Sequence, residues 1–229
     1  MAVKRRKWWR AALIVIAMLL IWTFVICFPN PYIFIRNGIR YVRPPVDPSI
    51  IQLIEEEIPE EPVEMEKFVL ALIQYKYDWE NYGMPDYVAT ARQAVSKRRG
   101  DCEDRAIVLA SLFEAKNMPY DLKASLVHYW IEYPGKKPNR GENEKVAFVG
   151  KVDGKYKIKL PDLGQWRRYM RAGRKGLWDA MPNYRKVLMI SGWALILLSI
   201  YPLAMGLPRR SPASMQDMDQ VDEDVENVK

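Results

Sequence analysis

The sequence predicts an α+β domain held between two membrane-spanning helices, and three observations support this. Two uncharged apolar runs, residues 11–28 and 187–205, lie towards the two ends of the 229-residue chain. Between them, helix-type apolar patterns fill residues 63–113, and strand-type patterns rich in β-branched and aromatic residues follow over residues 122–160. Helices followed by antiparallel strands are typical of the α+β class. The roughly 155 residues between the two runs are enough to bury a core of their own.

The first apolar run predicts a transmembrane helix over residues 11–28. It carries no charged residue and is long enough to cross the hydrocarbon core. A basic tail, residues 1–10, precedes it, and Trp8 and Trp9 stand where indole rings prefer the membrane interface. A cleaved signal peptide is the alternative, but the run is longer than such a peptide needs and no small-residue cleavage pattern follows it.

The second run predicts another transmembrane helix over residues 187–205. It is uncharged and lies between two basic pairs, Arg185-Lys186 and Arg209-Arg210. A buried core helix is the alternative, which the length and the flanking charges disfavour. Five basic residues among the first ten favour a cytoplasmic N-terminus. We therefore expect a multi-pass membrane protein with two spans and an extracytoplasmic domain.

Composition divides the rest of the chain into further segments. Residues 29–65 are rich in proline and glutamate and predict a spacer or extended arm. The predicted domain, residues 66–163, has helices over 63–77 and 86–97, a third helix that begins at Asp101, and then strands joined by an Asp153-Gly154 hairpin turn. Residues 164–186 are basic and aromatic and predict an amphipathic segment on the membrane surface. Residues 206–229 predict an acidic, disordered tail.

The net charge of +7 is concentrated beside the apolar runs, where lysine and arginine meet lipid head groups. We therefore expect the lipid bilayer as a partner, and no nucleic acid. The chain has two cysteines and one histidine, which excludes a zinc site of several cysteines and histidines. We expect no disulfide between Cys27 and Cys102, no metal and no cofactor.

Cys102 is the candidate nucleophile because it is predicted at the first position of a buried helix, after Asp101 as N-cap. The helix dipole and unpaired backbone amides there favour a thiolate. The carboxylates of Asp101, Glu103 and Asp104 oppose it, so activation requires a cation, and His128 is the one histidine of the chain. The simpler alternative is that Cys102 is a small buried apolar residue and His128 an ordinary strand residue.

Two motifs around this pair resemble a known family. The motifs are RGDCEDRA at residues 99–106, which opens an apolar helix, and HYWIE at residues 128–132 on a predicted strand. Together with the upstream Tyr77-Asp78, Gly83 and residues 85–90, they resemble the transglutaminase-like superfamily, in particular the bacterial transglutaminase-like cysteine proteinases. The resemblance covers about residues 66–162. It implies a papain/transglutaminase-like core, in which a central helix that bears the cysteine packs on an antiparallel sheet.

The resemblance also implies the roles of the site residues. Cys102 corresponds to the nucleophile and His128 to the general base. A third residue, an aspartate on the next strand, orients the imidazole in the family, and Asp162 is our choice for it. Asp153 is the alternative, although it fits the hairpin turn better, and Glu132 is a weaker candidate.

The expected function is acyl transfer or hydrolysis on amide bonds through a thioester on Cys102. The substrate would be a peptide, a protein or a cell-wall amide, and the sequence leaves open whether water or an amine resolves the thioester. The alternative is an inactive fold of the same kind that serves as a membrane-tethered binding or scaffold module. A third possibility is that residues 164–186 bind anionic lipid or nucleic acid.

Overall fold

The computed structural model describes residues 2–125, 128–137, 142, 149–152, 155–158, 164 and 166–204. It divides into two compact units: the described part of residues 1–19 and 191–229, and the described part of residues 20–190. The second unit contains the predicted domain, and the site lies within it.

Helix α1 (Ala2–Cys27) contains the first predicted span. Of the described helices, it alone is long and apolar enough to cross a membrane, over Trp9–Cys27, and 11% of that stretch is buried. The structure therefore contains one helix that could span a membrane, near the N-terminus. The residues of the second predicted span lie in helix α8 (Asn183–Ala204), apart from residue 205, which is outside the described residues. The second span stays a prediction.

The segment predicted as a spacer contains regular structure. Helix α2 (Pro31–Val42) begins at Asn30, whose side chain accepts a hydrogen bond from the amide of Tyr32 at 3.0 Å, and proline occupies its first turn. A 3₁₀ helix, η1 (Pro48–Leu53), follows and places Ile50 in the core with no exposed surface. The prolines prevent one long helix in this segment. The two short elements α2 and η1 nevertheless begin at prolines, because proline is tolerated in the first turn of a helix.

Helix α6 (Cys102–Ala115) is the centre of the domain. Ten of its residues are buried, among them Ile107, Val108, Leu112 and Phe113, which agrees with the prediction of a helix that is apolar nearly all round. Helices α3 (Pro62–Leu72) and α5 (Ala91–Lys97), the 3₁₀ helix η1 and strand β4 (Tyr129–Glu132) pack around it. A helix enclosed in this way can hold the groups at its N-terminus in a fixed position.

Two helix predictions were too long. The first helix ends at Leu72, because the chain then forms the short strand β1 (Gln74–Tyr75), which pairs in parallel with β2 (Arg99–Gly100). The second begins at Ala91 and not at 86, because Thr90 and Gln93 form a capping box that sets its start. Between β1 and α5 lies the single-turn helix α4 (Asp78–Asn81).

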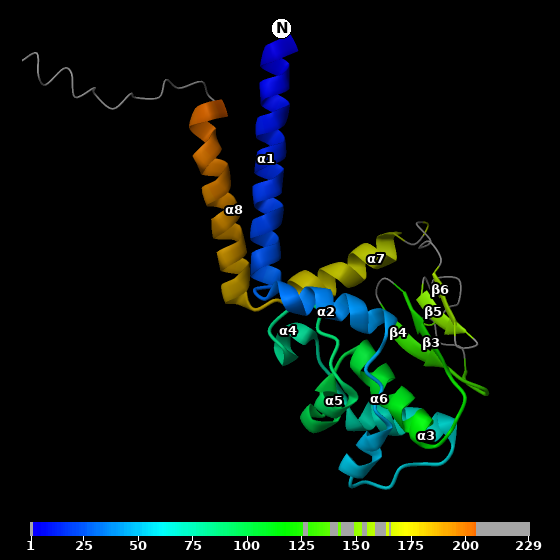
Figure 1. Ribbon diagram of the computed structural model, residues 1–229. Helices are drawn as coiled ribbons and strands as arrows, with labels where there is room; N and C mark the ends of the chain where they lie inside the picture. The colour runs from blue at the N-terminus through cyan, green and yellow to red at the C-terminus, as the bar shows by residue number, and fades with distance from the viewer. Residues whose placement is uncertain are drawn as a thin grey trace, which may run out of the picture. The chain divides into compact units, whose positions relative to one another are not determined.

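The strands form a four-stranded antiparallel sheet in the order β4-β3-β5-β6 (Figure 1). Its members are β3 (Asp121–Ala124), β4 (Tyr129–Glu132), β5 (Val149–Val152) and β6 (Lys155–Ile158), and Lys123 of β3 is paired with Trp130 of β4. Side chains of β3 and β4 join the core around α6. The helix-rich core with one antiparallel sheet confirms the predicted α+β class. The closer likeness to a papain/transglutaminase core stays a prediction.

The basic and aromatic segment after the sheet is helical. It forms α7 (Trp166–Gly173) and, directly after it, the π-helical turn η3 (Arg174–Asp179). The indole nitrogen of Trp79 donates a hydrogen bond to the carbonyl oxygen of Leu177 at 3.0 Å, which ties η3 to α4. This contact places the segment beside the site described next.

Candidate functional site

Cys102 is the first residue of α6, as predicted. Strand β2 ends at Gly100, and the side chain of Asp101 then accepts a hydrogen bond from the amide of Glu103 at 3.3 Å, which starts the helix. A Cβ atom on Gly100 would lie 2.4 Å from the Asp104 side chain, so glycine is required for the close approach of strand and helix. The Asp104 carboxylate accepts hydrogen bonds from the Ala89 amide at 3.3 Å and from the Tyr82 hydroxyl at 3.5 Å.

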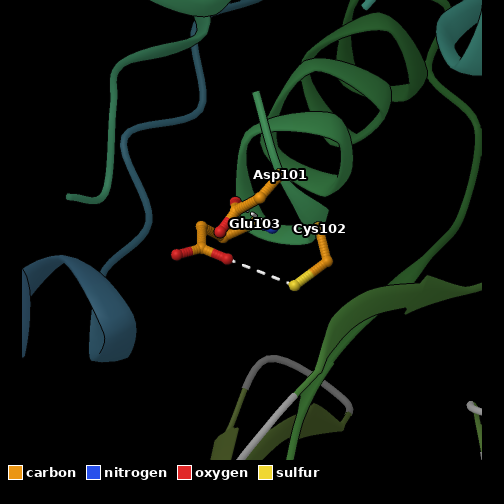
Figure 2. Close-up of side chains that lie close together, drawn as sticks. All are labelled: Asp101, Cys102 and Glu103. Carbon is orange, nitrogen blue, oxygen red and sulfur yellow. Dashed lines mark hydrogen bonds between the residues drawn. The ribbon is translucent and has the colours of Figure 1, made fainter. Parts of the chain in front are cut away.

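The Cys102 thiol lies beside two acidic residues, Asp101 and Glu103 (Figure 2). Its Sγ donates to Oε2 of Glu103 at 3.2 Å, and the backbone amide of Tyr129 donates to the sulfur. Burial raises the pKa of Cys102 well above its usual value, and the negative charges of Glu103 and Asp101 raise it further. The amide of Tyr129 lowers the pKa but does not offset these effects. In this arrangement the group is a thiol and not a thiolate.

His128 lies directly before β4, one residue from the predicted strand position. Its carbonyl oxygen accepts from the amide of Ser125 at 2.7 Å, and its ring stacks on Trp130 with centroids 5.5 Å apart. Cys102 and His128 line the same two cavities, of about 330 and 510 Å³. The structure thus brings the predicted pair together around shared space. Between these two described side chains there is no hydrogen bond, since the thiol is directed to Glu103.

The acid beside His128 is Glu142, which is not among the residues predicted from the sequence. Its Oε1 lies 3.4 Å from Nε2 of His128, and its Oε2 accepts from Nζ of Lys136 at 3.0 Å. Burial alone would raise the pKa of Glu142, but the hydrogen bonds and positive charges of His128 and Lys136 outweigh burial and lower it. A carboxylate held on Nε2 leaves Nδ1 as the ring nitrogen for a reacting group. Glu142 was missed because it lies in a polar loop without periodicity.

The three predicted candidates for the third residue have different outcomes. Asp162 and Asp153 lie outside the described residues. Glu132 is described, and its carboxylate accepts from the indole nitrogen of Trp130 at 3.0 Å. Glu132 therefore fixes the ring on which His128 stacks, and its hydrogen bond is with Trp130 and not with the imidazole.

A cluster of buried and half-buried carboxyl groups adjoins Cys102. Its members are Asp78, Asp86, Asp101, Glu103 and Asp104. Burial first, and then the charges of neighbouring carboxylates, raise the pKa of Asp78 to about 10, of Asp104 to about 7 and of Asp86 to about 6. Several of these groups therefore carry protons near neutral pH.

The same cluster contains the residues that could hold a metal ion. Three sets of three ligand atoms lie within 4.8 Å of one another: Asp101, Cys102 and Glu103; Asp78, Asp101 and Asp104; Asp78, Asp86 and Glu103. Oδ1 of Asp78 is buried without a hydrogen-bond partner among the described residues, while its Oδ2 accepts from the Tyr87 amide at 2.6 Å. Carboxylate oxygens of this kind are the ligands that Ca²⁺ and Mg²⁺ take. The sequence analysis did not find the cluster, because Asp78 and Asp86 are distant from Cys102 along the chain.

The larger cavity has a wall that the sequence did not predict. It is lined by Ala172, Gly173, Lys175, Gly176 and Leu177 of α7 and η3 as well as by Cys102 and His128. The basic segment therefore borders the site in addition to preceding α8. A substrate in this cavity would contact Cys102, His128 and this wall together.

No protein-family model, no curated protein and no solved structure matches this chain. The resemblance to the transglutaminase-like superfamily therefore rests on the sequence motifs alone and stays a prediction.

Proposed function

We propose that this protein is a membrane-anchored cysteine enzyme of the transglutaminase-like type, which transfers or hydrolyses acyl groups of amides through a thioester on Cys102. One observation carries the proposal. Cys102, at the first position of a buried helix, shares two cavities with His128, whose Nε2 is next to the carboxylate of Glu142. A thiol, an imidazole and an orienting carboxylate are the parts that thiol-dependent acyl transfer requires.

The reaction begins with a proton transfer. The Cys102 thiol loses its proton to Nδ1 of His128, and Sγ forms a bond to the amide carbonyl carbon. The oxygen of the tetrahedral intermediate carries the negative charge, and the backbone amide of Cys102 in the first turn of α6 is the donor that we assign to it. His128 then protonates the leaving amine as the C–N bond breaks, which leaves a thioester. Water or a second amine attacks this thioester and releases Cys102.

The raised pKa of Cys102 sets a condition on this mechanism. A thiol that donates to Glu103 is not in a preformed ion pair with His128. The proton transfer therefore accompanies substrate binding, when the carbonyl group enters the cavity and the thiol turns from Glu103 to the imidazole. In this mechanism Glu142 orients His128, and Asp162 is the residue that the family resemblance proposes for the same role.

Membrane anchoring by two spans is part of the proposal. The last turns of α1 and the first turns of α8 are linked, because the Trp22 indole donates to the Leu188 carbonyl oxygen at 3.2 Å and Arg185 donates to the Ile26 carbonyl oxygen at 2.5 Å. Val187, Leu195 and Leu198 of α8 are all more than 60% exposed, as lipid-facing side chains are. With the basic N-terminal tail on the cytoplasmic side, the domain is extracytoplasmic.

A second candidate function has its own support. The acidic surroundings of Cys102 oppose a thiolate, and this is what an inactive fold used as a membrane-tethered scaffold would tolerate. In that case Cys102 serves as a polar contact for Glu103, and the cavities bind a partner without chemistry.

Labelling with acyl-donor electrophiles tests the proposal. The full chain in detergent or vesicles is incubated with peptide amides and amine acceptors, and acyl transfer, hydrolysis and covalent labelling are followed by mass spectrometry. We expect turnover that Cys102→Ala and His128→Ala abolish, while Cys27→Ser, a change at the other free cysteine, leaves it intact. Turnover that survives Cys102→Ala would refute the proposal of a cysteine enzyme. Labelling of the thiol without turnover of any donor would favour the membrane-tethered scaffold.

A further inference from the structure

Helix α2 (Pro31–Val42) is amphipathic and its apolar side faces outward. Tyr32, Ile35 and Ile39 are 66%, 63% and 59% exposed, and Phe34 and Val42 are exposed as well. The spacing of residues 32, 35, 39 and 42 places these side chains on one side of a helix. We call Tyr32, Ile35, Ile39 and Val42 the outer face of α2.

The polar side of the same helix contacts the domain. The side-chain amide of Asn37 donates to the Asp86 carbonyl oxygen at 2.7 Å, and Arg40 donates to the Val88 carbonyl oxygen at 2.7 Å. The Arg36 guanidinium lies 4.4 Å from the centre of the Tyr87 ring. A surface helix of a soluble domain normally buries its apolar side and exposes its charges, and α2 does the opposite. The contacts of the inner side hold the helix in this orientation.

The start of α2 is fixed close to the end of the candidate membrane span. Three residues separate α1, which ends at Cys27, from the first residue of α2. The rings of Phe24, Phe28 and Phe34 meet at this corner with centroid distances of 5.1 to 5.5 Å. Within this unit, α2 runs away from the end of α1 along the domain (Figure 1). Its first residues therefore lie at the depth where the span leaves the hydrocarbon.

The composition of α2 suits this depth. Tyrosine is enriched at the membrane interface, and the helix contains arginine and no acidic residue. A second copy of the chain is a poorer occupant for the outer face. A helix of 12 residues is about 18 Å long, so a strip ~10 Å wide offers on the order of 180 Å², against about 800 Å² per partner in a stable interface.

We propose that α2 lies in the plane of the membrane–water interface, with its outer face among the first acyl carbons, so that a lipid bilayer is the partner of this surface. The inner side of α2 carries Tyr41, which donates to Asp86 at 2.5 Å and lies 3.2 Å from Glu103. Helix α2 thus lies between the lipid and the acidic groups beside Cys102, and its own diameter separates them. This inference rests on the membrane anchoring proposed above.

Environment-sensitive fluorophores on single cysteines test the placement. The full chain with Cys27→Ser and Cys102→Ser is reconstituted into phosphatidylcholine and phosphatidylglycerol vesicles, with and without bromine on the acyl chains, and labelled at Ile35→Cys or Ile39→Cys. Ile16→Cys in α1 is the reference for the hydrocarbon, and Lys67→Cys, exposed on α3, is the reference for water. We expect blue-shifted emission and quenching by brominated lipid at positions 35 and 39, and neither at position 67.

Three results overturn the inference, and they differ from one another. In the first, aqueous iodide quenches labels 35 and 39 to the same extent as label 67, while label 16 is in lipid. This result refutes the interfacial helix and leaves the span intact. Protection of both labels from iodide and from brominated lipid assigns the outer face to a second copy or another protein. An aqueous environment at label 16 refutes the span itself, and the inference fails with it.

Discussion

Glu103→Gln should make Cys102 more reactive, and the structure gives the size of the effect. The carboxylate of Glu103 lies 3.2 Å from the sulfur, and its charge is the second cause, after burial, of the raised pKa of the thiol. Two unit charges at this distance interact by about 1.3 kcal/mol at the dielectric constant of water and by about 5 kcal/mol at an effective value of ~20. The lower figure is the safer one because the cavities beside Cys102 admit water.

About 1.3 kcal/mol corresponds to a roughly tenfold larger thiolate fraction at neutral pH. A less basic thiolate is also a weaker nucleophile, with a Brønsted coefficient of ~0.4–0.5, so the alkylation rate should rise only about threefold. Glutamine keeps an oxygen that can accept from Tyr41, so the fold should be retained.

The assay is the rate of iodoacetamide modification of Cys102 between pH 6 and pH 10 in a Cys27→Ser chain. We expect the inflection of the Glu103→Gln profile at lower pH than that of the parent. Glu64→Gln, which removes an exposed acid that pairs with Lys67, is the control and should leave the profile unchanged. An unchanged profile for Glu103→Gln would refute the account of the site in which acidic neighbours keep Cys102 protonated.

The remaining predictions concern the imidazole, the buried acids and the turn before the helix. Glu142→Gln should lower turnover at least about tenfold without unfolding the protein, because the imidazolium of His128 loses its carboxylate; a loss confined to KM would contradict an orienting role. The melting temperature should fall between pH 5 and pH 8. A buried carboxyl such as Asp104 has a pKa of about 7 in the folded protein and near ~4 in the unfolded chain. Its contribution to stability is therefore fully present below the unfolded pKa and is lost as the pH rises through the folded pKa. Asp104→Asn should reduce this decline, and thermal melts at the two pH values measure it. Gly100→Ala should cost about 1–3 kcal/mol of stability, since its Cβ meets the Asp104 side chain at 2.4 Å, whereas Gly38→Ala has no atom within 4 Å and should not destabilise.

The sequence predicted those parts of the fold and site that depend on local pattern. The all-round apolar run after Asp101 predicted a buried helix, and the N-cap chemistry of Asp101 placed Cys102 at its first position. Alternation and a turn signal predicted the strands. These features follow from neighbours in the chain, so one sequence is enough to find them.

The parts that the sequence did not predict depend on contacts between distant residues. Glu142 lies beside His128 but belongs to a polar stretch of sequence without periodicity, and nothing in its sequence neighbours marks it. Asp78 and Asp86 join Glu103 only once α4 and the following loop pack beside α6. Helix α2 was missed because prolines nearby favoured a spacer, although Asn30 and Pro31 are a recognisable helix start.

The two candidate functions differ in what they require of Glu103. In a scaffold, the hydrogen bond from Cys102 to Glu103 is a permanent contact without a role in chemistry. In an enzyme, the same bond must break in each cycle, so Glu103 holds the thiol protonated until a substrate carbonyl enters the cavity. Turnover of Glu103→Gln therefore separates the two. An enzyme should retain turnover and hydrolyse small activated acyl donors faster, because its thiol is released from the acid, whereas a scaffold should gain reactivity toward iodoacetamide without gaining turnover.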